Sequence, residues 1–203
     1  MERPSHQNVA GAALGPAGPS AAASLRILGV DPGTVALGWG VIDSCGSARL
    51  ARVASGTLRG RGERAARLAA ICEAIQALCE RFRPAVLSLE QSFVGDNVQS
   101  AFRLGEVRGA VLVAAGRTGI AVAEYSPAQI KLAVAGSGRA AKAQMQAMVS
   151  RLLAVDGALG EDEADALGAA ICHVNAGQFA ARVAAASTGW GGAGRGRRAS
   201  RRR

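Results

Sequence analysis

The sequence predicts an α/β fold built on a mixed five-stranded sheet, with an antiparallel meander followed by parallel strands and with helices on both faces. Two patterns predict this fold class. Three apolar runs joined by short turns come first along the chain, as in a meander. After them, apolar runs of strand length alternate with segments whose apolar residues recur every three or four positions, which is typical of parallel strands joined by helices.

The meander is expected between residues 25 and 57. Residues 25–30 are apolar and predict the first strand, which ends at Asp31, and Pro32-Gly33 predicts a sharp turn after it. Residues 36–43 and 48–57 predict the second and third strands. Taken alone, Asp31 is either a turn acid that stabilises the Pro-Gly turn or a carboxylate at the mouth of a sheet.

Residues 64–82 form the clearest predicted helix. Its apolar residues step by three and four positions and therefore share one face: Leu68, Ile71, Ile75, Leu78 and Phe82. Pro84 ends the helix, and the apolar run 85–89 predicts a fourth strand that ends at a second acid, Glu90.

The remainder of the ordered chain is expected to be mostly helical. The sequence predicts one strand over 120–123 and helices over 98–117, 126–134, 139–155 and from the acidic segment 161–165 to about 178. Met145, Met148, Val149, Leu152 and Leu153 are expected to face inward from the third of these helices. Gly105 and Gly109 lie one turn apart in the first helix, where they permit another helix to approach, either within the monomer or in a dimer.

Composition and charge divide the chain into three parts. Residues 1–24 are rich in Ala, Gly, Pro and Ser and are expected to be a disordered extension. Residues 25–183 are expected to form one domain, and 184–203 a disordered, Arg-rich tail. The net charge is +9, and the last nine residues contain six Arg, which favours a polyanionic partner. A merely solubilising tail remains an alternative.

The sequence also points to a cellular compartment. No apolar run is long enough to cross a membrane, and the first residues do not resemble a secretory signal. The four cysteines lack the spacing of a metal site, and we expect them to be buried thiols in the reducing cytoplasm.

Four acids are candidates for a catalytic site. Parallel pairing of the first and fourth strands would bring Asp31 and Glu90 together, because both lie at carboxyl ends of strands. Asp162 and Asp165 are three positions apart in the first turn of a helix and share one face. Converging carboxylates favour a hard divalent cation such as Mg²⁺, and the chemistry that suits such a site is metal-assisted phosphodiester hydrolysis. For the helical pair, compensation of the helix dipole is the alternative.

A resemblance to a known family rests on four segments within roughly residues 25–178: LGVDPGTVALGWGVID (28–43), LSLEQSFVGDNVQSAFRLGEVRGAVLVAA (87–115), YSPAQIKLAVAGSGRAAKAQM (125–145) and DEADALGAAICH (162–173). In this order and spacing they resemble RuvC, the family of bacterial Holliday junction resolvases. These are crossover junction endodeoxyribonucleases with the ribonuclease H fold, so the resemblance implies a ribonuclease H-like sheet.

The resemblance implies a catalytic and metal-binding set formed by Asp31, Glu90, Asp162 and Asp165. It implies Mg²⁺ as cofactor, two ions per site during catalysis, with Mn²⁺ able to replace it. The implied enzyme is a homodimer that cuts a four-way DNA junction by paired symmetric nicks in recombination and repair. Its products carry 5′-phosphate and 3′-hydroxyl ends, and its implied partners are the branch-migration proteins RuvA and RuvB.

The resemblance also implies DNA contacts by Phe93, Asn97, Lys131 and Lys142, with Phe93 stacking on a base. The two lysines stand out because all other basic residues among the 24 are arginines. A compact ammonium beside a scissile phosphate is not reproduced by a guanidinium, so we expect both lysines to contact the reacting phosphate region. Asp96 departs from the family, in which many relatives carry a basic residue at this position.

Three other interpretations are open at this stage. A YqgF-type nuclease of the ribonuclease H fold shares the DPGT hairpin, but the pair Asp162 and Asp165 favours the resolvase. An actin-like kinase would need two duplicated domains, for which the chain is short. A non-catalytic DNA-binding module would not need four acids. His173 matches no catalytic position, and we expect it to be buried and hydrogen-bonded.

Overall fold

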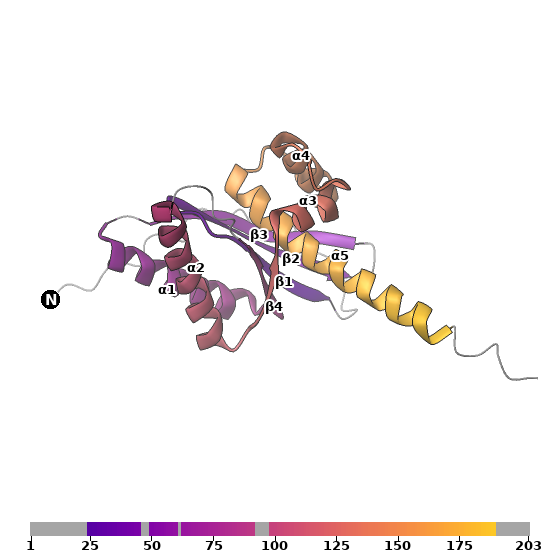
Figure 1. Cartoon of the computed structure of the whole chain (residues 1–203), viewed down its shortest axis with the longest axis horizontal. Helices are drawn as coiled ribbons and strands as arrows, with labels where there is room; N and C mark the ends of the chain where they lie inside the picture. Colours follow the sequence, from indigo (N-terminus) through magenta and orange to yellow (C-terminus); the bar gives the residue numbers. More distant parts are fainter. Residues whose placement is uncertain (1–23, 46–48, 61, 92–97, 190–203) are drawn as a thin grey trace, which may run out of the picture.

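The computed structural model describes residues 24–45, 49–60, 62–91 and 98–189. Its elements follow one another along the chain (Figure 1) as β1 (Leu25–Asp31), β2 (Ala36–Cys45), β3 (Arg49–Arg59), α1 (Arg64–Phe82), β4 (Val86–Glu90), α2 (Val98–Thr118), β5 (Ala121–Tyr125), α3 (Pro127–Ala135), α4 (Lys142–Leu152) and α5 (Glu161–Gly189). The expected α/β fold class is confirmed, and α1 has the predicted bounds.

The five strands form one mixed sheet in the order β3-β2-β1-β4-β5. β1, β2 and β3 are antiparallel neighbours, whereas β4 pairs in parallel with β1, and β5 in parallel with β4. The expected meander and parallel strands are therefore both present. Because β1, β4 and β5 run in the same direction, their carboxyl ends lie at one edge of the sheet.

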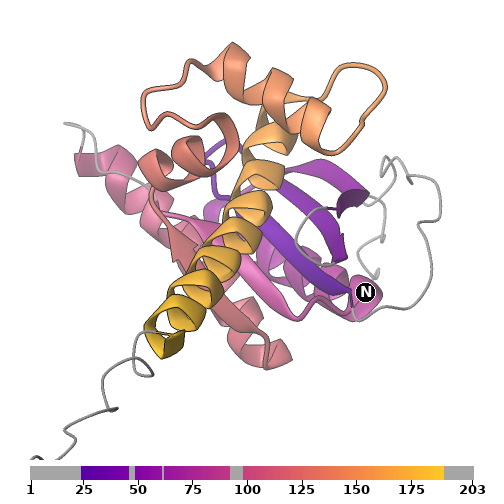
Figure 2. The same ribbon diagram turned by 90° about the vertical axis from the view of Figure 1, so that its right-hand side faces the viewer.

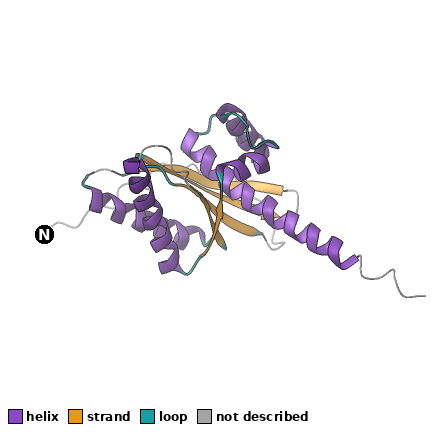
Figure 3. Ribbon diagram, in the orientation of Figure 1, coloured by secondary structure: helices purple, strands orange, loops and turns teal. Residues whose placement is uncertain are grey.

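Helices cover both faces of the sheet (Figure 3). Side chains alternate between the faces of a strand, and each face has its own core. Leu28, Val30 and Trp39 pack with α1 and α2 on one face. Ile27 and Ile42 pack with α3, α4 and α5 on the other.

Helix α5 crosses the sheet on its second face (Figure 2), over a row of small residues. This small-residue row contains one aligned residue from each strand: Ser55, Gly40, Gly29, Ser88 and Ala123. A Cβ on Gly29 would lie 2.0 Å from the carbonyl oxygen of Ala166, so only glycine lets the helix approach this closely. The hydroxyl of Ser88 donates to the carbonyl of Ala169 at 2.7 Å and fastens the middle of α5 to β4.

Several local expectations were wrong. Helix α5 continues to Gly189, beyond the expected end near 178 and into the segment assigned to the tail, because its alanine-rich sequence favours helix. Helix α4 is shorter than expected, and Ala154 just after it has a positive φ of 47°. Leu152 is exposed rather than inward. Cys79 and Cys172 are buried, but Cys45 and Cys72 are half-buried; all four are free thiols.

None of the helices within the described ranges combines the length and the apolar character needed to cross a membrane. Residues 1–23 and 190–203, which contain most of the two expected disordered segments, lie outside the described residues, as does the loop 92–97.

Candidate active site

The carboxyl edge of the sheet presents a second aligned row, two residues beyond the small-residue row in the direction of β1. Gly38 of β2 pairs with Asp31 of β1, and Glu90 of β4 pairs with Tyr125 of β5. Asp31 and Glu90 follow the pair Val30 and Leu89, so the two acids end neighbouring parallel strands. By strand alternation both point to the face that α5 covers. The expected placement of these two acids is therefore confirmed.

The first turn of α5 brings two more acids to this edge because Gly38 has no side chain. A Cβ on Gly38 would lie 1.9 Å from the carbonyl oxygen of Asp162 and 3.1 Å from its Cβ. The backbone of Asp162 thus occupies the space above β2, directly beside Asp31. Asp165 follows three positions later on the same face of the helix. Its charge, and that of Asp162, act on the Asp31 carboxyl.

Burial and mutual repulsion raise the pKa values of Asp31, Glu90 and Asp165. Burial, followed by the charges of Asp165 and Asp162, raises the pKa of Asp31 to about 6. Burial, followed by the charge of Asp31 and then of Asp165, raises the pKa of Glu90 to about 8. Burial also raises the pKa of Asp165, although Lys142 opposes that shift. The cluster is short of positive charge.

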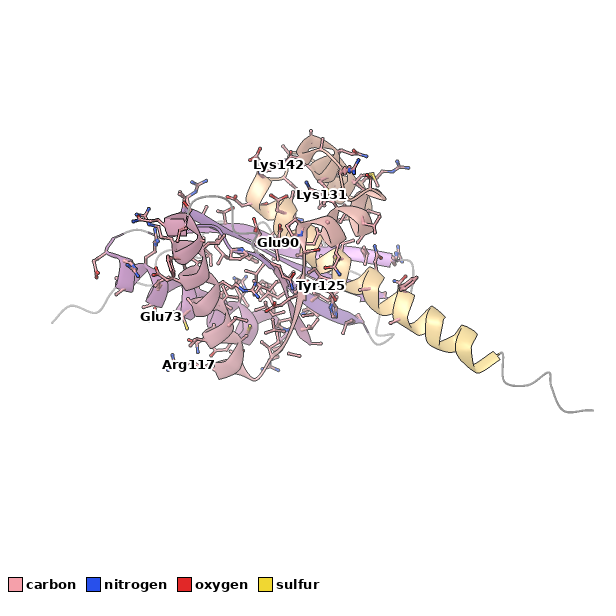
Figure 4. The ribbon with its side chains drawn as sticks, viewed as in Figure 1. Glu73, Glu90, Arg117, Tyr125, Lys131 and Lys142 are labelled. Atoms are coloured by element: carbon pink, nitrogen blue, oxygen red, sulfur yellow. The ribbon has the colours of Figure 1, made fainter. Side chains whose placement is uncertain are left out.

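Both lysines lie beside the acids (Figure 4). Lys131 stands on α3, whose start is fixed immediately after β5 by a capping box between Ser126 and Gln129. Its charge opposes the rise in the pKa of Glu90 that burial and the neighbouring acids cause. Lys142 is the first residue of α4, and its Nζ lies 2.9 Å from a carboxylate oxygen of Glu161 and 3.6 Å from one of Asp165.

The carboxylate oxygens suit a hard cation, although the acidic side chains are farther apart in this structure than metal ligands would be. Within the described part of the chain, no three His, Cys, Asp or Glu side chains are close enough to hold a metal ion as they stand. Lys142 supplies part of the positive charge that the carboxylates require. Four carboxylates on one edge are nevertheless the oxygen donors that Mg²⁺ prefers.

Two supporting contacts could not be predicted from the sequence. Arg108 of α2 donates to the carbonyl oxygen of Glu90 at 3.3 Å and forms an ion pair with Glu124 at 2.5 Å, which fixes the end of β4 against β5. The hydroxyl of Tyr125 lies 2.9 Å from Nδ1 of His173. The expected hydrogen bond of His173 is therefore confirmed, but the side chain is half-buried rather than buried, and this partial burial lowers its pKa.

Three of the sequence-predicted residues fall on the loop after β4. Phe93, Asn97 and the unusual Asp96 lie outside the described residues, so their predicted roles toward DNA stay predictions.

A family model described as crossover junction endodeoxyribonuclease RuvC matches residues 27–173. The chain belongs to the RuvC family. Among curated relatives, the RuvC of Variovorax paradoxus is 46% identical over 167 residues, which cover 80% of this chain and 91% of the relative. The RuvC of Burkholderia vietnamiensis is 48% identical over 154 residues, which cover 75% and 85%. Membership in the RuvC family favours the resolvase over the YqgF-type alternative.

Solved structures agree with the family. Thermus thermophilus RuvC in complex with a Holliday junction substrate superposes with a TM-score of 0.73 at 31% identity, over 77% of this chain and 96% of that chain. The yeast mitochondrial Holliday junction resolvase Ydc2 gives a TM-score of 0.58 at 13% identity, which supports the fold alone. The ribonuclease H-like fold expected from the resemblance to the RuvC family is confirmed.

Proposed function

We propose that this protein is the crossover junction endodeoxyribonuclease that resolves four-way DNA junctions by paired symmetric nicks, in homologous recombination and DNA repair. The observation that carries the proposal is the meeting of Asp31, Glu90, Asp162 and Asp165 at one sheet edge in a chain of the RuvC family. Carboxylates alone repel DNA. Their retention beside two lysines therefore indicates hydrolysis rather than simple binding.

We assign these four acids as the catalytic, metal-binding set of a metal-dependent nuclease, with Mg²⁺ as the ion and Mn²⁺ as its substitute. Two bound ions would activate water and stabilise the oxygen that leaves the phosphodiester. Asp31 and Glu90 are held by paired strands, whereas Asp162 and Asp165 are carried by a helix. The position of Asp31 and Glu90 is therefore fixed by the sheet, whereas the position of Asp162 and Asp165 depends on how α5 packs against the sheet.

The chain's own residues prepare the site for an anionic substrate. With a pKa of about 8, Glu90 carries a proton at neutral pH in the protein alone and must release it to become a charged oxygen donor. Lys131 and Lys142 reduce the repulsion that the acids exert on a phosphate. We assign DNA contacts to both lysines and to Phe93 and Asn97. We expect the cleaved strands to carry 5′-phosphate and 3′-hydroxyl ends.

The proposal is tested with a synthetic four-way junction and Mg²⁺, comparing the wild type with Asp31→Asn. We expect paired nicks at symmetry-related positions from the wild type and none from the variant, with junction binding retained by both. A wild type that binds the junction and leaves its strands intact would contradict the proposal.

We infer that the enzyme is a homodimer joined through α2. Val98 and Phe102 are 63% and 70% exposed, and Val113 is also exposed. A Cβ on Gly105 or Gly109 would meet no atom of another described element within 4 Å, so these glycines do not serve packing against the rest of the described chain. An exposed apolar and glycine stripe suits a two-fold contact with a second copy.

The dimer is tested with Phe102→Asp, measured by sedimentation and by junction cutting. We expect a folded monomer that nicks one strand but loses the pairing of the two nicks. A variant that stays dimeric would show that α2 is not the interface.

Three further assignments rest on the family. We propose a cytoplasmic location, RuvA and RuvB as partners, and a nuclease domain that runs from residue 25 to the end of α5 at Gly189, between the extension 1–24 and the Arg-rich end of the chain. Co-purification of RuvA and RuvB with the protein on junction DNA tests the partnership.

A further inference from the structure

The first turn of α5 carries four acids, and one of them points away from the site. Asp162 and Asp165 face the sheet edge, and Glu161 forms an ion pair with a lysine. Glu163 turns instead to β3, where it accepts a hydrogen bond from the hydroxyl of Ser55 at 3.3 Å. This contact joins residues 108 positions apart in the chain. It lies on the side of the turn opposite to the catalytic acids.

The contact belongs to a built network. Ser55 is 1% exposed, and a buried hydroxyl requires hydrogen-bond partners. The Ser55 hydroxyl has a donor and an acceptor as partners. Nη1 of Arg52 donates to the hydroxyl oxygen at 3.0 Å, and the hydroxyl donates to Glu163. Charge at both ends strengthens such a chain of hydrogen bonds. We call these three residues the Arg52–Ser55–Glu163 network.

A β-bulge makes this network possible. Val41 of β2 pairs with Ala54, but the next residue, Ile42, pairs with Arg52, so Val53 is the extra residue of β3. In a regular strand, residues three positions apart point to opposite faces. The bulge places both Arg52 and Ser55 on the face that α5 covers. Bulges beside active sites commonly redirect side chains in this way.

The first turn of α5 is held on the side of the site by ion pairs of Lys142 with Glu161 and Asp165, and on the side of β3 by the hydrogen bond between Ser55 and Glu163. Under the start of α5 the sheet offers Gly38, Gly40 and Gly29, a surface without side chains. Such a surface permits close approach, with Leu167 of α5 packed directly over Gly40, but it offers the first turn no polar side chain. The polar tie at Ser55 is therefore suited to fix the orientation of the first turn.

We propose that Glu163 is a positioning residue, through which the Arg52–Ser55–Glu163 network sets the direction in which Asp162 and Asp165 face. A helix with its side chains has a radius of about 5–6 Å, so a rotation of about 10° moves a carboxylate by about 1 Å. A misplacement of about 1 Å can reduce a catalytic rate by about 100-fold. This inference rests on the proposed function, because it assigns a task toward the metal-binding acids.

The test compares Glu163→Ala, Glu163→Gln and Ser55→Ala. Glu163→Gln removes the charge and keeps the oxygen acceptor, whereas Ser55→Ala keeps the charge and removes the donor. Glu73→Ala is the matched control, because it removes an exposed carboxylate from α1, far from the site (Figure 4). Three quantities are measured: the rise in melting temperature on adding Mn²⁺ without DNA, the single-turnover cutting rate, and the junction Kd.

We expect Glu163→Ala and Ser55→Ala to lose most of the Mn²⁺-induced rise and at least about tenfold in cutting rate, with Kd changed by less than about twofold. A variant that combines Ser55→Ala with Glu163→Ala should cut no more slowly than Glu163→Ala alone, because both substitutions break the same network. Glu73→Ala should behave like the wild type, and Glu163→Gln should stay much closer to it than Glu163→Ala does, because the amide oxygen keeps the acceptor but loses the strength that charge adds.

Two outcomes would overturn the inference: Glu163→Gln as impaired as Glu163→Ala, which would assign the effect to charge, or Ser55→Ala and Glu163→Ala both at wild-type level. Failure of the proposed function is distinguishable. In that case the wild type itself leaves junctions uncut, while the Mn²⁺-induced rise still reports on the position of the acids.

Discussion

Gly38→Ala tests whether the position of the first turn of α5 controls the chemistry. The added Cβ would lie 1.9 Å from the carbonyl oxygen of Asp162 and 2.5 Å from its carbonyl carbon, whereas real Cβ contacts are essentially never closer than 3.0 Å. The obstacle is backbone, so no side-chain rotation relieves it. The turn that carries Asp162 and Asp165 must retreat from Asp31 by about 1 Å.

The expected result is a folded but slow enzyme. A displacement of about 1 Å corresponds to a loss of about 100-fold in cutting rate, and overpacking should lower the free energy of unfolding by about 1–3 kcal/mol. The control is Gly56→Ala, where a Cβ would meet the Trp39 ring at 2.9 Å on the opposite face. It should cost similar stability but, because α5 is not touched, only about twofold in rate.

Single-turnover cutting of a four-way junction gives the rate, and urea denaturation gives the stability of each variant. The reasoning is refuted if Gly38→Ala cuts at nearly the wild-type rate, or if Gly56→Ala slows cutting as much as Gly38→Ala does.

Further predictions concern pH, the lysines and the tail. Because the pKa values of Glu90 and Asp31 are raised in the fold, the folded state holds more protons than the unfolded one, and stability is lost as pH rises through about 6 and 8. In metal-free urea denaturation, Glu90→Gln should reduce the fall in the free energy of unfolding between low and high pH by roughly 2–4 kcal/mol. A wild type equally stable at pH 5 and 9 would contradict the expectation. Lys131→Arg and Lys142→Arg should each slow junction cutting by about tenfold with binding retained; wild-type rates in both would exclude a contact with the reacting phosphate. Deleting 195–203 should lower the log–log salt slope of DNA binding by up to about 5, and an unchanged slope would show that the tail makes no phosphate contact.

The strand-borne half of the site could be predicted from sequence because the signals are local. An apolar run that stops at Asp31, and another that stops at Glu90, mark strand ends without knowledge of the packing. The apolar stripe of the helix over 64–82 gave its bounds in the same way. The helix that precedes the fourth strand is compatible with parallel pairing through a right-handed crossover, and the structure shows that the two strands are parallel neighbours.

The helix-borne half depends on packing that no local pattern reveals. The glycines under α5 are recognisable as an interface only when Gly38 is seen against Asp162. The role of Glu163 was missed because its partner is far away in sequence, and because no residue type marks Val53 as a bulge. Helix α5 extends beyond its expected end because the alanines between residues 180 and 186 favour helix, whereas the Gly, Ser and Arg content from residue 184 onward predicts a disordered tail.

The four acids are spread along the folded chain, so the ribosome completes the set only when it has made the start of α5. Asp31 leaves the ribosome early, whereas Asp162 and Asp165 arrive with the last helix. A nascent or truncated chain that stops before α5 therefore carries only half of the carboxylates, and it lacks one of the three helices that pack on the second face of the sheet. If the four acids form the active site as proposed, junction cutting requires α5, and we expect a chain that stops before this helix to be inactive.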